Sequence, residues 1–365
     1  MKNARGTLVH SKRLALAVIC TSLFFAHVLS SWLCAQETQG LTSPALGTWA
    51  FELPDGYPAW LGVESTEDGI GASLLWSVGS AREVNDLQVN GSNLKFQRKL
   101  KWRFRGTEEL KSEIREITSP FHGKVVGDTL ELEFNFRTAS AGGEGPLSAS
   151  GAKGETLKLM GKRMPPLPPK PDLSRVTFGK PIELFDGKSL AGWHLANSRA
   201  ENGWRAEGGE LVNETPKTDF SAYGQFGNLV TDRKFDDFRL TIEYNVEAHA
   251  NSGIYLRGMY EAQVVDRDSR MQGIAGPGAI FGRIEPTENA GRPGGDWNRY
   301  VLTLVNRHVT VELNGTKVVD NAGLIGCTGG GLSADDTQAG PIFLQGDHTS
   351  VRYRNIVLEP VVGRR

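Results

Sequence analysis

Four side chains that could take part in acid–base chemistry or hydrogen bonding lie in two neighbouring segments, IYLR and YEAQVVD. Both segments have the residue types of β-strands, in which side chains two positions apart share a face. Tyr255 and Arg257 therefore share one face of the first strand, and Glu261 and Gln263 share one face of the second. Such a face is either solvated or forms the floor of a binding cleft. Glu261 is the one carboxylate on it and is the first candidate for proton transfer, with a rim ion pair to Arg257 as the structural alternative.

A third segment, LQGDHTS, adds polar side chains at the end of a strand: Gln345, Asp347 and His348. A histidine titrates near neutral pH, so His348 could act as a base or as a metal ligand, with an exposed loop histidine as the structural alternative. No metal-binding spacing motif occurs, so a divalent metal ion is left open. The side chains that could supply oxygen or nitrogen ligands are Asp186, His249, Glu261, Asp347 and His348.

Strand-like segments dominate the part of the chain that must position these residues. FRLTIEYNV, RYVLTLVNRHVTVELNGTKVVD and VRYRNIVLEP have alternating or β-branched patterns, and Asn314-Gly315 is typical of a hairpin turn. No long run has the 3.6-residue period of a helix, which argues against a parallel α/β fold. The pattern favours an all-β, two-sheet sandwich of the jelly-roll kind.

A proline-rich segment predicts the domain organisation. Residues 161–175 contain five prolines, which favour an extended, semi-rigid linker. Residues 41–160 before it read as short antiparallel strands, for example TLELEFNFR, and predict a smaller β-barrel or half-barrel of unknown role. Residues 176–362 form the predicted sandwich domain.

The first 35 residues have the pattern of a secretory signal peptide. A basic beginning is followed by the apolar run LALAVICTSLFFAHVL and by small residues before Gln36. We therefore expect a secreted or periplasmic protein without a stable membrane anchor; an uncleaved anchor is the alternative. Removal of this segment leaves a net charge of −5 and one cysteine, Cys327. Nucleic-acid binding, which needs a clustered excess of basic residues, is not expected.

Seven segments occur in an order that resembles a known family. They are ELFDGKSLAGWH, GGELV, FDDFRLTIEYNVEAHANSGIYLRG, YEAQVVD, GAIFG, GGDWNRYVLTLVNRHVTVELNGTKVVD and GPIFLQGDHTSVRYRNIVLEP. Together they resemble the 3-keto-disaccharide hydrolase domain family over Lys180–Val362. The resemblance implies a concanavalin A-like jelly roll with a ligand groove on its concave face, in secreted bacterial proteins that act on 3-oxo sugars. The loop Ile325–Gln338 is longer and richer in glycine than the family pattern.

A 3-oxo glycoside has a chemical weak point that the candidate residues could use. The C3 ketone acidifies the proton on C2, so a base can remove it, and the glycosidic oxygen on C1 then leaves by β-elimination. Water adds across the double bond, and the net result is hydrolysis. Glu261 and His348 are the acid–base candidates, and Arg257 could stabilise the enolate oxygen. Paired carboxylates that flank the scissile bond are not required.

Other residues could bind the sugar. Gln263 shares the face of Glu261 and could hydrogen-bond a hydroxyl group, while Tyr255 and Trp297 could stack on a sugar ring or belong to the core. Asn251 lies in a predicted turn, where it could cap the backbone or contact the ligand. The remaining two predicted contacts are Gln345 and Asp347.

Three functions remain open from the sequence. The first is an enzyme that cleaves 3-oxo glycosides by deprotonation at C2, elimination and hydration. The second is a carbohydrate-binding module of the concanavalin-like type without chemistry. The third is a structural protein of the cell surface. Convergent titratable groups favour the enzyme, whereas aromatic platforms without such groups favour the binding module.

Overall fold

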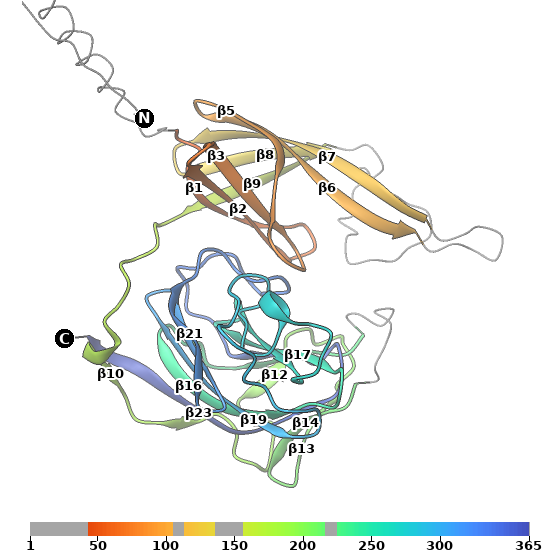
Figure 1. Cartoon of the computed structure of the whole chain (residues 1–365), viewed down its shortest axis with the longest axis vertical. Helices are drawn as coiled ribbons and strands as arrows, with labels where there is room; N and C mark the ends of the chain where they lie inside the picture. Colours follow the sequence, from red (N-terminus) through yellow and green to blue (C-terminus); the bar gives the residue numbers. More distant parts are fainter. Residues whose placement is uncertain (1–42, 105–112, 136–155, 216–224, 365) are drawn as a thin grey trace, which may run out of the picture. The chain divides into compact units, whose positions relative to one another are not determined.

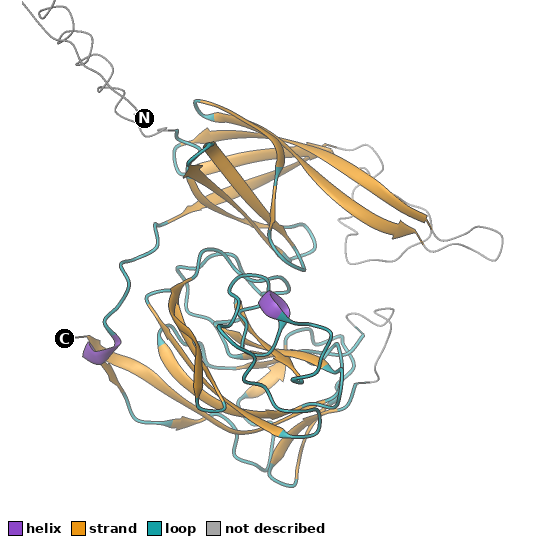
Figure 2. Ribbon diagram, viewed as in Figure 1, coloured by secondary structure: helices purple, strands orange, loops and turns teal. Residues whose placement is uncertain are grey.

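The computed structural model describes residues 43–104, 113–135, 156–215 and 225–364 (Figure 1). In these residues strands dominate, joined by loops and two short 3-10 helices, η1 (Leu173–Arg175) and η2 (Gly273–Ala275) (Figure 2). The all-β prediction is confirmed. The predicted signal peptide, residues 1–35, lies outside the described residues. No helix in the described part of the chain is both long and apolar enough to cross a bilayer.

The first nine strands form one antiparallel sheet in the order β4-β3-β2-β1-β9-β8-β7-β6-β5. Its two edge strands, β4 and β5, are separated in sequence only by Val84, so the sheet curls back on itself as a half-barrel. This confirms the predicted antiparallel half-barrel. The strands are β1 (Gly47–Glu52), β2 (Pro58–Thr66), β3 (Gly69–Trp76), β4 (Arg82–Glu83), β5 (Asn85–Asn90), β6 (Asn93–Phe104), β7 (Glu113–Val126), β8 (Thr129–Asn135) and β9 (Thr156–Met164).

Aromatic side chains fill the inner face of this first sheet. Phe96 and Phe121 stack with ring centroids 4.8 Å apart, and Trp76 meets Phe134 edge to face at 4.9 Å. Such pairs contribute roughly 0.5–1.5 kcal/mol each beyond the area that they bury. The alternation of buried and exposed residues along the strands therefore gives the curled sheet a core of its own.

Two further antiparallel sheets make up the rest of the described chain. The larger has the order β13-β14-β23-β16-β19-β20-β21, with β10 and β11 paired to β23, and the smaller has the order β12-β15-β22-β17-β18. The strands are β10 (Val176–Phe178), β11 (Ile182–Glu183), β12 (Trp193–Leu195), β13 (Trp204–Glu207), β14 (Glu210–Asn213), β15 (Leu229–Thr231), β16 (Phe238–Asn245), β17 (Asn251–Leu256), β18 (Tyr260–Val265), β19 (Trp297–Val305), β20 (His308–Leu313), β21 (Thr316–Gly323), β22 (Phe343–Leu344) and β23 (Val351–Arg364).

One apolar core joins these two sheets, as expected for a jelly-roll sandwich. Leu240 and Leu302 belong to the larger sheet, Ile254 and Ala262 belong to the smaller one, and all four side chains are fully buried in the same cluster. Because side chains alternate along a strand, the residues next to Ile254 and Ala262, which include Tyr255 and Glu261, point out of the other face of the smaller sheet. The predicted two-sheet fold is confirmed, and this register determines the position of the candidate site.

The proline-rich linker contacts the sandwich. The carbonyl oxygens of Pro165 and Pro166 accept hydrogen bonds from Arg307, and that of Pro171 accepts one from Asn321 at 2.7 Å. Residues 43–365 group as one compact unit. The division into domains at residues 161–175 therefore stays a prediction.

Candidate functional site

A buried polar cluster lies on the outer face of the five-stranded sheet. In the pairing of β17 with β18, Tyr255 lies opposite Glu261 and Gly253 lies opposite Gln263. The exposed fraction is 1% for Tyr255, 3% for Glu261 and 1% for Gln263. These three side chains share one face of the sheet, as the sequence pattern predicts. A solvated sheet face is excluded, because almost none of their polar surface reaches solvent.

The Glu261 side chain fits against the neighbouring strand because Gly253 has no side chain. A Cβ atom added at Gly253 would collide with the Glu261 carboxyl group. Burial raises the pKa of Glu261, a hydrogen bond with Tyr255 opposes the rise, and the nearby negative charge of Asp347 adds to it, so that the pKa is about 8. Glu261 is therefore mostly protonated at neutral pH and can donate a proton.

Tyr255 connects Glu261 to a neighbouring loop. Its ring stacks on Phe343 with centroids 4.4 Å apart, and its hydroxyl group donates to the Gly329 carbonyl at 2.9 Å. A phenol has one proton to donate. While Tyr255 donates this proton to the Gly329 carbonyl, the protonated Glu261 can donate to the Tyr255 oxygen. Once Glu261 is ionised, the Tyr255 hydroxyl group can donate to the carboxylate instead. The pair can thus accommodate both protonation states of Glu261.

Two buried amide groups beside this pair have unused acceptors. Gln263 donates from Nε2 to the side-chain oxygen of Asn251 at 3.1 Å. The Oε1 atoms of Gln263 and Gln345 are buried and have no hydrogen-bond partner among the described residues. A buried acceptor without a donor is costly, and hydroxyl groups of a ligand are suitable donors. Gln263, Asn251 and Gln345 are therefore arranged for contact with a polyhydroxylated molecule.

Asp347 and His348 form a close pair after β22. The Asp347 Oδ1 atom lies 2.6 Å from Nδ1 of His348, and the backbone N–H groups of Gly346 and Asp347 donate to Asn228 Oδ1 at 2.7 and 3.2 Å. In a neutral ring that donates its Nδ1 proton to Asp347, the lone pair is on Nε2. This arrangement suits a base. The effect of Asp347 on the pKa of Glu261 shows that the acid and the pair belong to one electrostatic site.

The loop 325–338 lies against the polar cluster. In addition to the bond from Tyr255 to Gly329, the Thr328 hydroxyl accepts from the Glu261 backbone N–H at 3.0 Å and donates to the Met259 carbonyl at 2.9 Å. The first sheet also contacts this loop, since Trp60 Nε1 donates to the Cys327 carbonyl at 2.9 Å. The glycine-rich insertion noted in the sequence is therefore part of the site.

Arg257 is placed differently from the expectation. β17 ends at Leu256, and Arg257 lies in the turn with a φ of +56°, so it does not share the face of Tyr255. Its guanidinium group donates to the carbonyl oxygens of Asp336, at 2.7 Å, and Gln338. The structure thus gives Arg257 a role in holding loop 325–338, and the predicted contact with an enolate oxygen is not supported by this geometry.

Trp297 is also separated from the cluster. It begins β19 in the other sheet, where the guanidinium group of Arg354 lies 3.9 Å from its ring centroid. The expectation that Trp297 stacks on a sugar bound beside Glu261 is therefore wrong. Aromatic spacing along the sequence gave no indication of the sheet to which this strand belongs.

The metal candidates do not come together. Within the described ranges, no three His, Cys, Asp or Glu side chains are grouped as metal ligands. Asp186 is in a turn, where its carboxylate accepts from the backbone N–H groups of Lys188 and Ser189 at 2.8 Å. His249 has a φ of +62° and donates its own backbone N–H to Asp266 at 2.6 Å. The divalent ion considered from the sequence thus has no assigned ligand set.

Three contributors to the site were not identified from the sequence: Gly253, Asn228 and Phe343. Gly253 lies two residues after Asn251, where the sequence predicts a turn, but it is a strand residue opposite Gln263. Asn228 and Phe343 carry no catalytic signal of their own, because one positions a loop and the other packs against Tyr255. The strand pairing of Phe343 with Tyr255 is the signal that would have found it.

Comparison with known proteins relates this chain to carbohydrate-active proteins. Residues 180–359 match a family model described as the 3-keto-alpha-glucoside-1,2-lyase-like domain. A 3-keto-disaccharide hydrolase of Bacteroides thetaiotaomicron is 24% identical over 166 residues, which are 38% of this chain and 57% of that protein. The chain thus spans less than two thirds of this relative.

Solved structures of two candidate glycosyl hydrolases from Parabacteroides distasonis are also similar. One is 29% identical and covers 55% of this chain and 94% of its own, with a TM-score of 0.40. The other is 19% identical and covers 50% of this chain and 94% of its own, also with a TM-score of 0.40.

Proposed function

Because residues 180–359 belong to the 3-keto-alpha-glucoside-1,2-lyase-like domain family, we propose that this protein cleaves the glycosidic bond of 3-oxo glycosides. The observation that carries the proposal is the buried carboxyl group of Glu261, with a pKa raised to about 8, in one electrostatic site with the Asp347–His348 pair. An acid that remains protonated at neutral pH, combined with a histidine base, suits a reaction that needs both.

The proposed reaction begins at C2 of the sugar. His348 takes the C2 proton, the electron pair forms an enolate with the C3 ketone, and the Tyr255 hydroxyl group turns from Gly329 to donate to the enolate oxygen. The enolate then expels the C1 oxygen, to which Glu261 gives its proton, and the leaving alcohol departs. Water adds at C1 after losing a proton to Glu261, and the imidazolium of His348 returns a proton to C2. Each group ends in its starting protonation state.

Access to this site requires a movement. Glu261 is 3% exposed, and loop 325–338 contacts both Glu261 and Tyr255. A sugar ring cannot reach a carboxyl group that is covered in this way. We therefore propose that loop 325–338 opens to admit the substrate and closes to exclude water from the enolate.

A carbohydrate-binding module is the second candidate. The unpaired acceptors of Gln263 and Gln345 would serve sugar binding even if no bond were broken. The same chain could then recognise a saccharide without turnover. We also propose export to the periplasm or the exterior with removal of residues 1–35, which rests on the sequence pattern alone.

One experiment separates these functions. The chain from Gln36 is incubated with a 3-oxo disaccharide and, as a control, with the ordinary disaccharide; both incubations are run with and without a chelator. Release of the free 3-oxo sugar only from the oxidised substrate supports the enzyme. Binding without release supports the module, and neither binding nor release contradicts both. Loss of activity with the chelator would reveal a metal requirement.

A further inference from the structure

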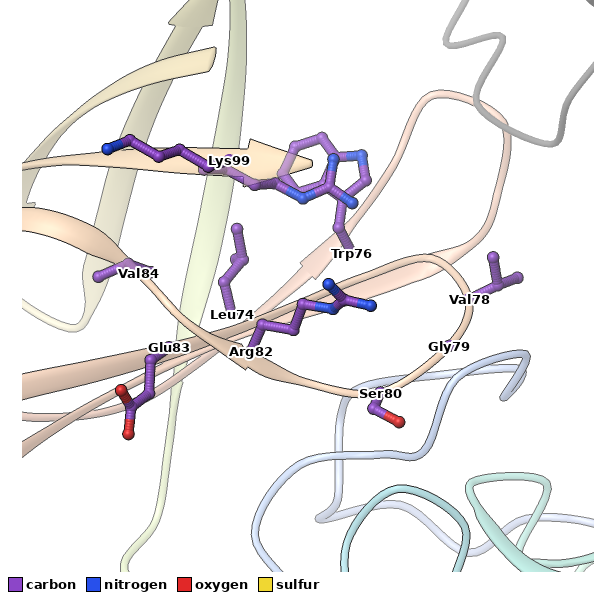
Figure 3. Close-up of a pocket in the computed structure, with 10 residues that line it drawn as sticks. Leu74, Trp76, Val78, Gly79, Ser80, Arg82, Glu83, Val84 and Lys99 are labelled. Atoms are coloured by element: carbon purple, nitrogen blue, oxygen red, sulfur yellow. The ribbon is translucent and has the colours of Figure 1, made fainter. Parts of the chain in front are cut away.

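A cavity in the first sheet, outside the residues matched by the family model, carries two arginine side chains. It has a volume of about 140 Å³ and lies between strands β3, β4 and β6. Its walls include Leu74, Trp76, Val84 and the side chains of Arg82 and Arg98 (Figure 3).

The strand register directs both arginines to the inside of the curled sheet. On β6, Leu94 and Phe96 are buried in the core, and Arg98 is the next residue on the same face. On β4, Arg82 lies directly opposite Leu74, which also belongs to the core. Arg98 is partly buried and Arg82 is exposed, so two cations border a space that the strand pattern otherwise fills with apolar side chains.

Neither arginine has an acidic partner in the described part of the chain. Glu83 also borders the cavity, but it lies opposite Ser73 and turns away from Trp76, whereas Arg82 extends toward it (Figure 3). Lys99, at the rim, has its own acid at 4.0 Å, Asp86.

In the larger sheet of the sandwich, two arginines are paired with glutamates. Arg239 is bound to Glu359 at 2.8 Å, and Arg354 is bound to Glu243 at 2.7 Å. A partly buried charge without a partner is unfavourable, so Arg98, with Arg82 beside it, offers a site for an external anion.

The position of Arg98 leaves its donors available. Its guanidinium carbon lies 5.8 Å from the ring centroid of Trp76, a distance typical of a cation–π contact. A guanidinium group that stacks by its face still has N–H groups along its edges, and these match the two oxygens of a carboxylate. Burial and the positive charge of Arg82 together lower the pKa of Arg98 to about 10, so the group remains charged at neutral pH.

We propose that this cavity binds the carboxylate group of an acidic sugar, with Arg98 and Arg82 as its two cationic contacts. A cavity of about 150 Å³ is known to accommodate benzene, so the volume suits a carboxylate and the adjoining part of one sugar ring. That the ligand is a sugar rests on the proposed function, whereas its negative charge rests on the two arginines alone. The first sheet would then select acidic saccharides for the site at Glu261.

Calorimetric titration tests the pocket without relying on turnover. Glucuronate is titrated into the full chain from Gln36 and into its Arg98→Gln, Arg82→Gln and Lys95→Gln variants; glucose, acetate and sulfate are titrated into the unsubstituted protein. Lys95 is exposed on the opposite face of β6, so its variant makes the same charge change outside the cavity. We expect about tenfold weaker glucuronate binding in each arginine variant and no change with Lys95→Gln, because charge-assisted hydrogen bonds are lost only in the former.

A stability measurement separates ligand binding from a structural role. If the arginines exist for a ligand, Arg82→Gln removes repulsion and leaves the melting temperature of the free protein unchanged or higher. A clear fall in both arginine variants would indicate structural partners and overturn the proposal. Absence of glucuronate binding to the unsubstituted protein would also overturn it.

The comparison ligands test the two parts of the assignment. Equal affinity for sulfate would refute carboxylate recognition, and equal affinity for acetate would refute recognition of the sugar. Glucuronate binding in a protein that fails to cleave 3-oxo glycosides would leave the pocket in place and reject the reaction.

Discussion

Replacement of Glu261 by glutamine should make the protein more stable and less active at the same time. The substitution keeps the shape and the hydrogen-bonding capacity of the side chain but removes its ionisation. Burial raises the pKa of Glu261 from 4.5 to about 8. Between these two values the unfolded chain releases the proton of Glu261, whereas the folded protein retains it.

The sign and size of the stability effect follow from this difference. A raised folded-state pKa contributes stability that is fully present below pH 4.5 and is lost as the pH rises toward 8. At about 1.4 kcal/mol per pKa unit, the full loss is on the order of 5 kcal/mol, and about 3 kcal/mol of it has occurred at pH 7. Glutamine imitates the protonated form at every pH. The Glu261→Gln protein should therefore match the unsubstituted protein near pH 4.5 and exceed its stability progressively above it.

The assay combines denaturation with kinetics. Urea midpoints are measured at pH 5, 7 and 8.5, and cleavage of a 3-oxo disaccharide is followed at pH 7. General acid–base groups contribute roughly 10²–10⁴-fold to a rate, so we expect a loss of that order with a much smaller change in sugar affinity. In the unsubstituted protein the rate should fall as the pH rises through about 8, when Glu261 loses its proton. Glu64→Gln, at an exposed position of the first sheet, is the matched control.

Two results would refute this reasoning. A stability difference that does not vary with pH would show that Glu261 titrates normally in the folded protein. Full activity of Glu261→Gln would remove this residue from the chemistry, whatever its stability. A stabilised but inactive variant is the combination that a purely structural glutamate does not produce, because a structural residue has no reason to limit the rate.

The other predictions concern the neighbours of Glu261 and the start of the mature chain. Gly253→Ala should lower both stability and activity, since its Cβ would collide with the Glu261 carboxyl group; a melting curve and a rate measurement check this. Gln263→Ala should weaken sugar binding by about 0.5–1.5 kcal/mol with a smaller effect on the catalytic rate, as calorimetry and kinetics would show. His348→Ala should reduce the rate as much as Glu261→Gln if His348 is the base, and rescue by an added divalent ion would instead make it a metal ligand. N-terminal sequencing of protein from the source cell should give Gln36, and recovery of Met1 would contradict export.

The sequence predicted the partners in the site better than their surroundings. Period-two alternation places Glu261 and Gln263 on one face of β18, and the structure has this register. Alternation cannot reveal what covers that face. Residues 325–338, about 70 positions away in the chain, contact Tyr255 and the backbone of Glu261, and only tertiary contacts determine where that loop lies.

The misplacement of Arg257 has a local cause. The strand pattern continues through it on the basis of residue type, but the chain turns at Arg257 and Gly258, both of which have positive φ. Positive φ is uncommon for arginine, so no sequence rule would have ended the strand there. The energetic cost of this backbone conformation is offset by hydrogen bonds from the guanidinium group to loop 325–338.

Loop 325–338 thus connects the chemistry to the stability of the protein. It contacts Tyr255 and the backbone of Glu261, and the burial of Glu261 raises the pKa of the acid and lowers the stability of the fold near neutral pH. The hydrogen bonds from Tyr255, Arg257 and Trp60 to loop carbonyl groups hold the cover in place against that cost. In the proposed reaction, opening of the loop admits water to the site and lowers the pKa of Glu261 from its raised value, so closure of the loop prepares the acid to protonate the leaving group. Substrate enclosure and preparation of the acid are therefore one event in the proposed reaction.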